Sequence, residues 1–100
     1  MSLHFHPLTV KSVRKETADC VSIEFEVPAT LQQTFAYKQG QNIAIKTQIN
    51  GQEIRRNYSI CTSTQENRLR VAVKKMEGGL FSTYANDTLK KGVVLEVFPP

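Results

Sequence analysis

The stretch RRNYS, residues 55–59, places an arginine, an aromatic ring and a hydroxyl close together in a segment with strand-forming character. Alternate residues of a strand share a face, so Arg56 and Tyr58 lie on one face and Ser59 lies on the other. A guanidinium can hold a phosphate through paired hydrogen bonds, an aromatic ring can stack against a flat heterocycle, and a small hydroxyl can hydrogen-bond its rim. The combination suits a ligand that has both a pyrophosphate and a flat ring.

A second candidate site for an anion follows where Gly78 and Gly79 precede an apolar segment with helical spacing. Paired glycines allow close approach of the backbone to a ligand, and a helix start offers unpaired N–H groups and the positive end of the helix dipole. Ser82, in the first turn, adds a hydroxyl. Each motif alone has an ordinary alternative, either a strand with surface arginines or a simple turn before a helix. Together the two motifs favour one dinucleotide that bears a flat ring.

The segments that must position these residues are mostly strands. The first begins near Leu8, and its alternation slips near Ser12 as a β-bulge would cause. Residues 21–27 alternate strictly between apolar and polar, which predicts a half-buried strand with Glu24 on its polar face. Asn50-Gly51 predicts a type I′ turn between two further strands.

Two more strands, at residues 69–73 and 93–97, flank the one convincing helix, at residues 80–86. Residues 62–68 are polar and typical of a loop. About six strands with frequent turn signals predict an all-β fold. Because short strands leave exposed edges unless their sheet closes, we expect a six-stranded antiparallel barrel with one short helix.

Composition limits the class of protein. The chain has 100 residues, which suits one domain. It has 13 Lys and Arg against 9 Asp and Glu, and the net charge of +4 fits either a solvated surface or an anionic partner. No apolar run approaches the ~20 residues that cross a bilayer, and the first residues lack the features of a signal peptide. We therefore expect a cytoplasmic location, no membrane association and, with two cysteines and no paired-ligand spacing, no metal site.

The pattern Arg56-x-Tyr58-Ser59, followed by Gly78-Gly79-x-x-Ser82, resembles the flavin-binding domain of the ferredoxin–NADP reductase superfamily. The resemblance covers essentially the whole chain in order. The run from residue 51 to 61 and residues 76–79 are similar to the reductase subunits of phenylacetyl-CoA epoxygenases, which act in bacterial phenylacetate degradation. Further framing residues agree: Gly40-Gln41 before one strand, residues 71–74 within another and Gly92 before the last.

The resemblance implies a Greek-key barrel that binds FAD. By position, Arg56 pairs with the pyrophosphate and Tyr58 stacks on the isoalloxazine. Ser59 hydrogen-bonds near flavin N5, where hydride arrives, which makes Ser59 the implied catalytic residue.

The same resemblance assigns the remaining cofactor-binding residues. Val73 and Lys74 contact the ring edge or the ribityl chain. Gly78, Gly79 and Ser82 close on the phosphates from the helix start. No metal-binding residue is implied within the chain.

For a longer parent protein, the resemblance implies an NAD(P)H-dependent oxidoreductase. A hydride passes from nicotinamide to flavin, and single electrons leave through a [2Fe–2S] cluster to an oxygenase in phenylacetate or other aromatic degradation. Such a cluster needs about four protein ligands, and the chain has two cysteines. We therefore expect residues 1–100 to be one truncated FAD-binding domain without the NAD(P)-binding and [2Fe–2S] domains, and without efficient turnover of its own.

Two other functions fit a small basic barrel. A nucleic-acid-binding barrel could track a phosphate backbone, although few aromatics beyond Tyr58 are available to stack on bases. It predicts binding with a steep salt dependence. A docking barrel without a cofactor predicts a colourless protein that ignores added FAD. The cations available to the first alternative are Arg55, Arg56, Arg68, Arg70, Lys74 and Lys75.

Overall fold

The computed structural model describes residues 4–62 and 68–100, so most of the predicted loop at 62–68 lies outside the described residues. The described chain contains six strands, one 3-10 turn and one α-helix, which confirms the all-β class. No helix in this part of the chain is long and apolar enough to span a membrane. In order, the elements are β1 (His6–Thr17), β2 (Cys20–Glu26), η1 (Ala29–Leu31), β3 (Asn42–Ile49), β4 (Gln52–Ser59), β5 (Leu69–Lys74), α1 (Leu80–Asp87) and β6 (Val94–Phe98).

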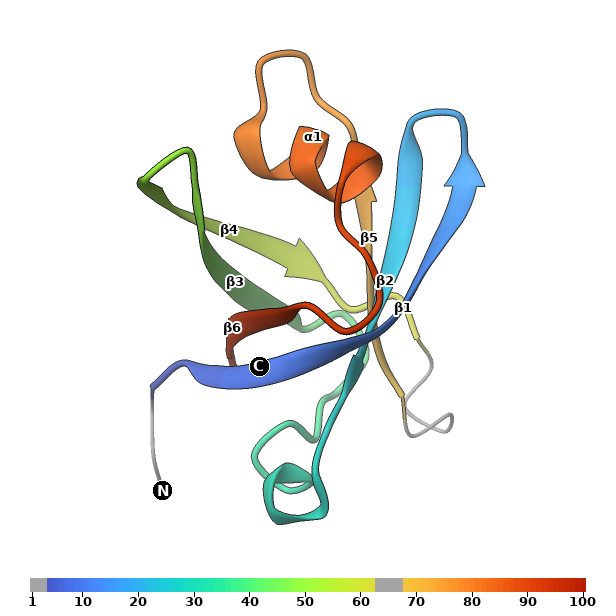
Figure 1. Cartoon of the computed structure of the whole chain (residues 1–100). Helices are drawn as coiled ribbons and strands as arrows, with labels where there is room; N and C mark the ends of the chain where they lie inside the picture. Colours follow the sequence, from blue (N-terminus) through green and yellow to red (C-terminus); the bar gives the residue numbers. More distant parts are fainter. Residues whose placement is uncertain (1–3, 63–67) are drawn as a thin grey trace.

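The strands form one antiparallel sheet in the order β4-β3-β6-β1-β2-β5, with β6 returning between β1 and β3 as in a Greek key. The sheet curls until its edge strands β4 and β5 approach each other (Figure 1). Among the described residues, the Ile60–Val71 bridge and a 2.8 Å bond from the Cys61 N–H to the Arg70 carbonyl join these edges. The predicted barrel is therefore closed at one end, while β4 and β5 diverge along the rest of their length.

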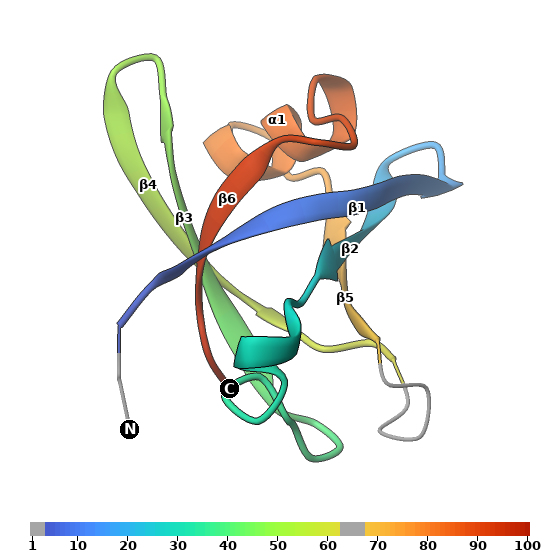
Figure 2. The same ribbon diagram turned by 60° about the horizontal axis from the view of Figure 1, so that its bottom comes forward.

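Helix α1 covers the end at which β4 and β5 diverge. It lies between the tips of the β3–β4 and β1–β2 hairpins (Figures 1 and 2). Its Phe81 and Ala85 side chains are buried in the hydrophobic core. The helix thus covers the core where β4 and β5 are not hydrogen-bonded to each other. Its N-terminus lies beside the edge of β4.

Two local predictions are confirmed. Asn50 and Gly51 both have positive φ, 53° and 76°, as a type I′ turn requires. The register between β1 and β2 shifts between Val10 and Ser12, which is the predicted bulge.

The expected exposure of the polar face of β2 is wrong at two residues, because Ser22 and Glu24 are each 4% exposed. The Ser22 hydroxyl donates to the Glu16 carboxylate at 2.7 Å, and Glu24 is covered by cations. The Glu24 carboxylate accepts hydrogen bonds from Arg68, at 2.8 and 3.2 Å, and from Arg70, at 3.0 Å, while the Lys11 ammonium lies 3.8 Å away. Hydrogen bonds from Arg68 outweigh the effect of burial and lower the pKa of Glu24 to about 2. Strand alternation correctly puts Glu24 outside the barrel, but these cations cover it.

Candidate functional site

The side chains of Arg56 and Tyr58 lie on the same face of β4. Their partners on β3 are Ile45 and Ile43, both buried in the core, so this face of β4 turns inward. Tyr58 is half-buried, and its ring centroid lies 5.6 Å from that of Phe81 in the first turn of α1. The tyrosine is therefore at the junction between the edge strand and the helix start.

Burial raises the pKa of the Tyr58 hydroxyl above its usual range, and the nearby Arg56 charge partly opposes the shift. The side chain is therefore a neutral phenol at physiological pH. A neutral ring that is half-buried against Phe81 offers its remaining surface to a stacking partner.

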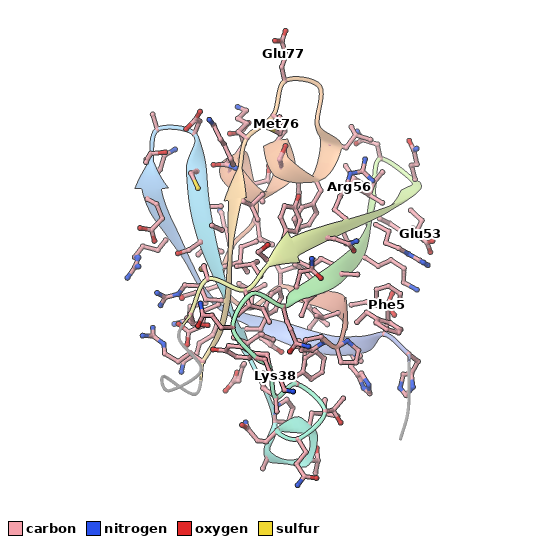
Figure 3. All side chains as sticks on the ribbon, turned by 180° about the vertical axis from the view of Figure 1, so that it is seen from behind. Phe5, Lys38, Glu53, Arg56, Met76 and Glu77 are labelled. Atoms are coloured by element: carbon pink, nitrogen blue, oxygen red, sulfur yellow. The ribbon has the colours of Figure 1, made fainter. Side chains whose placement is uncertain are left out.

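Arg56 is exposed, and its Nη1 donates to the carbonyl of Arg55 at 2.8 Å. Within the described residues it has no carboxylate partner. Figure 3 shows Arg56 on the side of β4 that faces α1, and Phe5 on the opposite side of the hairpin. Arg55 belongs to that opposite side, since its guanidinium carbon lies 4.9 Å from the centroid of the Phe5 ring. Of the two adjacent arginines, Arg56 is the one available to an anion beside α1.

The loop before α1 presents backbone N–H groups. Gly78 has a φ of +73°, which favours glycine, and Gly79 caps the helix in an extended conformation. The Thr83 N–H donates to the Gly79 carbonyl at 3.1 Å, so the amides of residues 80–82 precede that first helical hydrogen bond. They form the positive end of the α1 dipole, as the sequence predicts.

The Ser82 hydroxyl bonds within the loop itself. Ser82 is 5% exposed, and its Oγ accepts the Met76 N–H at 3.0 Å. A phosphate contact from this residue would have to use its backbone N–H. The hydroxyl instead closes the loop that contains Gly78 and Gly79.

Replacing Gly79 with alanine should cost about 1 kcal/mol of stability, because an added Cβ would lie 2.5 Å from the Ser82 Oγ and displace its bond to Met76. In a Ser82→Ala background this obstacle is gone, and the same glycine replacement should cost less, with only the Met76 carbonyl and Cβ still close, at 3.2 and 3.3 Å. Thermal midpoints of the four proteins measure the difference. Equal costs in both backgrounds would contradict the proposed clash.

A cavity of about 520 Å³ lies between the tip of the β3–β4 hairpin and the start of α1. Gly78 and Gly79 are the predicted site residues that line it. The sequence patterns do not predict the hairpin side of this cavity, although Asn50-Gly51 marks the turn. The lining residues are Gln48, Ile49, Asn50, Gly78, Gly79, Leu80, Thr83, Tyr84 and Thr88.

The remaining predicted residues are more dispersed. Ser59 and Lys74 are exposed, and Ser59 lies on the opposite face of β4 from Tyr58. One ligand can contact both Ser59 and Tyr58 only if it crosses the edge of β4 that does not pair with β3. Val73 is 0% exposed as a whole residue, and its carbonyl accepts a hydrogen bond from the Asn86 side chain, so it presents no accessible surface to a ligand.

Most of the cations that a nucleic-acid track would use interact with other groups. Arg68 and Arg70 bind Glu24, and Lys75 binds Asp87 at 2.9 Å. Arg55 lies over Phe5. The arrangement counts against a continuous basic groove within the described residues.

The fold is that of a known class of domains. The crystal structure of a ferredoxin NADP+ reductase from Neisseria gonorrhoeae, with bound FAD and NADP, superposes with a TM-score of 0.80 at 15% identity and covers 97% of this chain and 37% of that one. This likeness shows the ferredoxin reductase-type barrel. A family model described as the oxidoreductase FAD-binding domain matches residues 7–100, and the chain belongs to that family. The match confirms the expected resemblance and FAD as the cofactor.

Two relatives indicate the kind of protein in which such a domain occurs. The chain is 46% identical over 96 residues to one of the subunits of 1,2-phenylacetyl-CoA epoxidase from Escherichia coli K12, covering 96% of this chain and 27% of that protein. The structure of phthalate dioxygenase reductase, described as modular for electron transfer from pyridine nucleotides to [2Fe-2S], matches at 28% identity with a TM-score of 0.74, covering 96% and 29%. The chain thus spans about a quarter of the length of the curated relatives it matches.

The residues beside α1 fit FAD. Arg56 offers a guanidinium without a carboxylate partner in the described chain, and α1 offers free amides for a pyrophosphate. Tyr58 offers a neutral aromatic face for a flat ring. The side chains of Ser82 and Val73 do not add to this set, because both are buried.

Proposed function

We propose that this chain is the FAD-binding domain of a cytoplasmic NAD(P)H-dependent reductase that delivers electrons through an iron–sulfur centre to an oxygenase of phenylacetate or related aromatic degradation. The position of Arg56 and Tyr58 beside the amide end of α1 is the observation that best supports the FAD site. The likeness to the phenylacetyl-CoA epoxidase component and to phthalate dioxygenase reductase supports the proposed partner.

Bound FAD would supply the redox chemistry, accepting a hydride and releasing electrons one at a time. The chain itself binds and orients the cofactor. Arg56 and the amides at the start of α1 neutralise the pyrophosphate, while Gly78 and Gly79 allow the backbone to approach it. Tyr58 stacks on the isoalloxazine, and Ser59 donates its hydroxyl near N5 from across the strand edge.

Lys74, at the end of β5, would contact the ring edge or the ribityl chain from the second edge strand. Val73 would support the site from the core rather than touch the cofactor, because it is fully buried. The Ser82 amide, rather than its hydroxyl, would face the phosphates, because the hydroxyl already accepts the Met76 N–H.

Replacing Tyr58 with alanine should weaken FAD binding by roughly 0.5–1.5 kcal/mol through loss of the aromatic pair. Tyr58→Phe should cost less, since the stacking face remains. Titration of flavin fluorescence measures both affinities, and the bound wild-type complex should be quenched. If alanine, phenylalanine and tyrosine gave the same affinity and the same quenching, the stacking role would be rejected.

Because Tyr58 also packs on Phe81, the alanine variant loses core contacts as well. Val97→Ala is the control for this loss, since Val97 is a buried core residue on β6 that does not line the cavity beside α1. The control should lower the thermal midpoint of the FAD-free protein while retaining the quenching of bound flavin.

A further inference from the structure

The segment that directly follows Ser59 is held by a group of three polar atoms. Thr62 is 4% exposed, and its Oγ1 lies 2.7 Å from the Arg68 carbonyl oxygen and 2.8 Å from the Tyr37 hydroxyl. The Tyr37 hydroxyl also lies 2.8 Å from the same carbonyl. We refer to Tyr37, Thr62 and the Arg68 carbonyl as the hydroxyl lock.

The lock joins three parts of the chain that are distant in sequence. Tyr37 comes from the connection between η1 and β3, Thr62 follows the end of β4, and Arg68 precedes β5. The two hydroxyls each carry one proton, so at most two of these three contacts are hydrogen bonds at any moment. Removing the Thr62 hydroxyl removes the side-chain contacts of the segment after β4 with Tyr37 and Arg68, whereas removing the Tyr37 hydroxyl leaves the bond from Thr62 to Arg68.

Neighbouring backbone bonds extend the same anchoring. The Ile60 N–H donates to the Gln41 carbonyl at 2.9 Å, and the Cys61 N–H donates to the Arg70 carbonyl at 2.8 Å. Glu24 in turn binds the guanidinium groups of both Arg68 and Arg70. Cys61 and Thr62 are thus fixed to Arg70 and Arg68, whose guanidinium groups are held by the buried carboxylate, while Ile60 is fixed to the backbone before β3.

Ser59 differs from the residues after it. It is exposed, and the described residues give its hydroxyl no hydrogen-bond partner. Its position is therefore set by the backbone, because Ser59 itself pairs with Asn42 of β3 and the anchored residues 60–62 follow it. Small displacements of a positioned group have large effects on a bound reactant, up to ~100-fold for about 1 Å.

We propose that Tyr37 and Thr62 are positioning residues that fix Ser59 and Tyr58 for FAD at the edge of β4. The inference rests on the proposed FAD site and assigns the two hydroxyls no contact with the cofactor. It differs from a purely structural role, which would stabilise the barrel with or without FAD and leave the bound flavin unchanged.

The test compares Thr62→Val and Tyr37→Phe, which remove the hydroxyls and keep similar shapes. Thr17→Val is the matched control, because the Thr17 hydroxyl also donates a hydrogen bond, to Asp19 at 3.0 Å, but in the β1–β2 hairpin. Three quantities are measured on the full chain: the dissociation constant for FAD, the residual flavin fluorescence at saturation and the thermal midpoint without FAD.

We expect Thr62→Val to weaken FAD binding about tenfold and Tyr37→Phe about threefold, on the scale of one hydrogen bond. Both variants should raise the residual fluorescence of saturated flavin, whereas Thr17→Val should change neither quantity. Variants that lower the thermal midpoint but bind and quench FAD like the wild type would overturn the inference and establish a structural role alone.

A second comparison identifies the residue through which the lock acts. In a Ser59→Ala background, Thr62→Val should weaken FAD binding by clearly less than tenfold, because the group that it positions is already absent. An undiminished effect would reject positioning of Ser59. If the wild-type chain neither bound nor quenched FAD, the proposed function would fail together with this inference. If the wild type bound FAD normally, and Thr62→Val and Tyr37→Phe bound and quenched it equally well, only the positioning role of the lock would be rejected.

Discussion

Replacing Arg56 with alanine should weaken FAD binding by about 1.5–3 kcal/mol, or about 10- to 150-fold, the scale of a hydrogen bond to a charged group. The arginine has no carboxylate partner in the described chain and faces the amide end of α1. Its charge is therefore available to the pyrophosphate, and its removal breaks no ion pair within the described residues. Calorimetric titration with FAD measures the loss.

Arg55→Ala is the matched control for this prediction. Arg55 is the same residue type in the same strand, but it lies over the Phe5 ring on the opposite face. Its replacement should leave FAD affinity nearly unchanged and should reduce stability slightly through the lost cation–π contact. Equal losses of affinity in the two alanine variants would show that Arg56 has no specific role.

Replacing Glu24 with glutamine should lower the free energy of unfolding by about 2–3 kcal/mol at pH 7. The carboxylate is buried between Arg68 and Arg70, and a neutral amide cannot balance both guanidinium groups. Denaturant titration measures the difference. Glu26→Gln, an exposed position on the same strand, is the control and should have little effect.

The effect of Glu24 should depend on pH in a defined direction. Its pKa falls from 4.5 to about 2 in the folded protein, so the carboxylate stabilises the fold fully above the unfolded value. This contribution is lost as the pH falls from about 4.5 through about 2. The stability gap between wild type and Glu24→Gln should narrow over that interval, and a gap that stayed constant down to pH 2 would contradict the ion-pair explanation.

The sequence is informative where local geometry decides the structure. Asn50-Gly51 requires positive φ at adjacent residues, and few structures other than a type I′ hairpin satisfy that. Alternation likewise predicts the face shared by Arg56 and Tyr58. The glycine pair and the helical spacing after it predict the helix start at Leu80.

The rest depends on contacts between distant segments. Alternation places Glu24 on the outer face but does not reveal that arginines 44 and 46 residues later cover it. The meeting of Tyr37 with Thr62 joins two loops with no shared local pattern. The burial of the Ser82 hydroxyl depends on how the preceding loop folds back, which the spacing Gly78-Gly79-x-x-Ser82 cannot specify.

The central claim is that this chain binds FAD at the edge of β4 beside α1, and titration of FAD with the purified chain tests it most directly. We predict saturable quenching of flavin fluorescence at one FAD per chain, together with a rise in the thermal midpoint that grows with FAD concentration. FAD that stayed fully fluorescent and left the thermal midpoint unchanged at every concentration would contradict the claim.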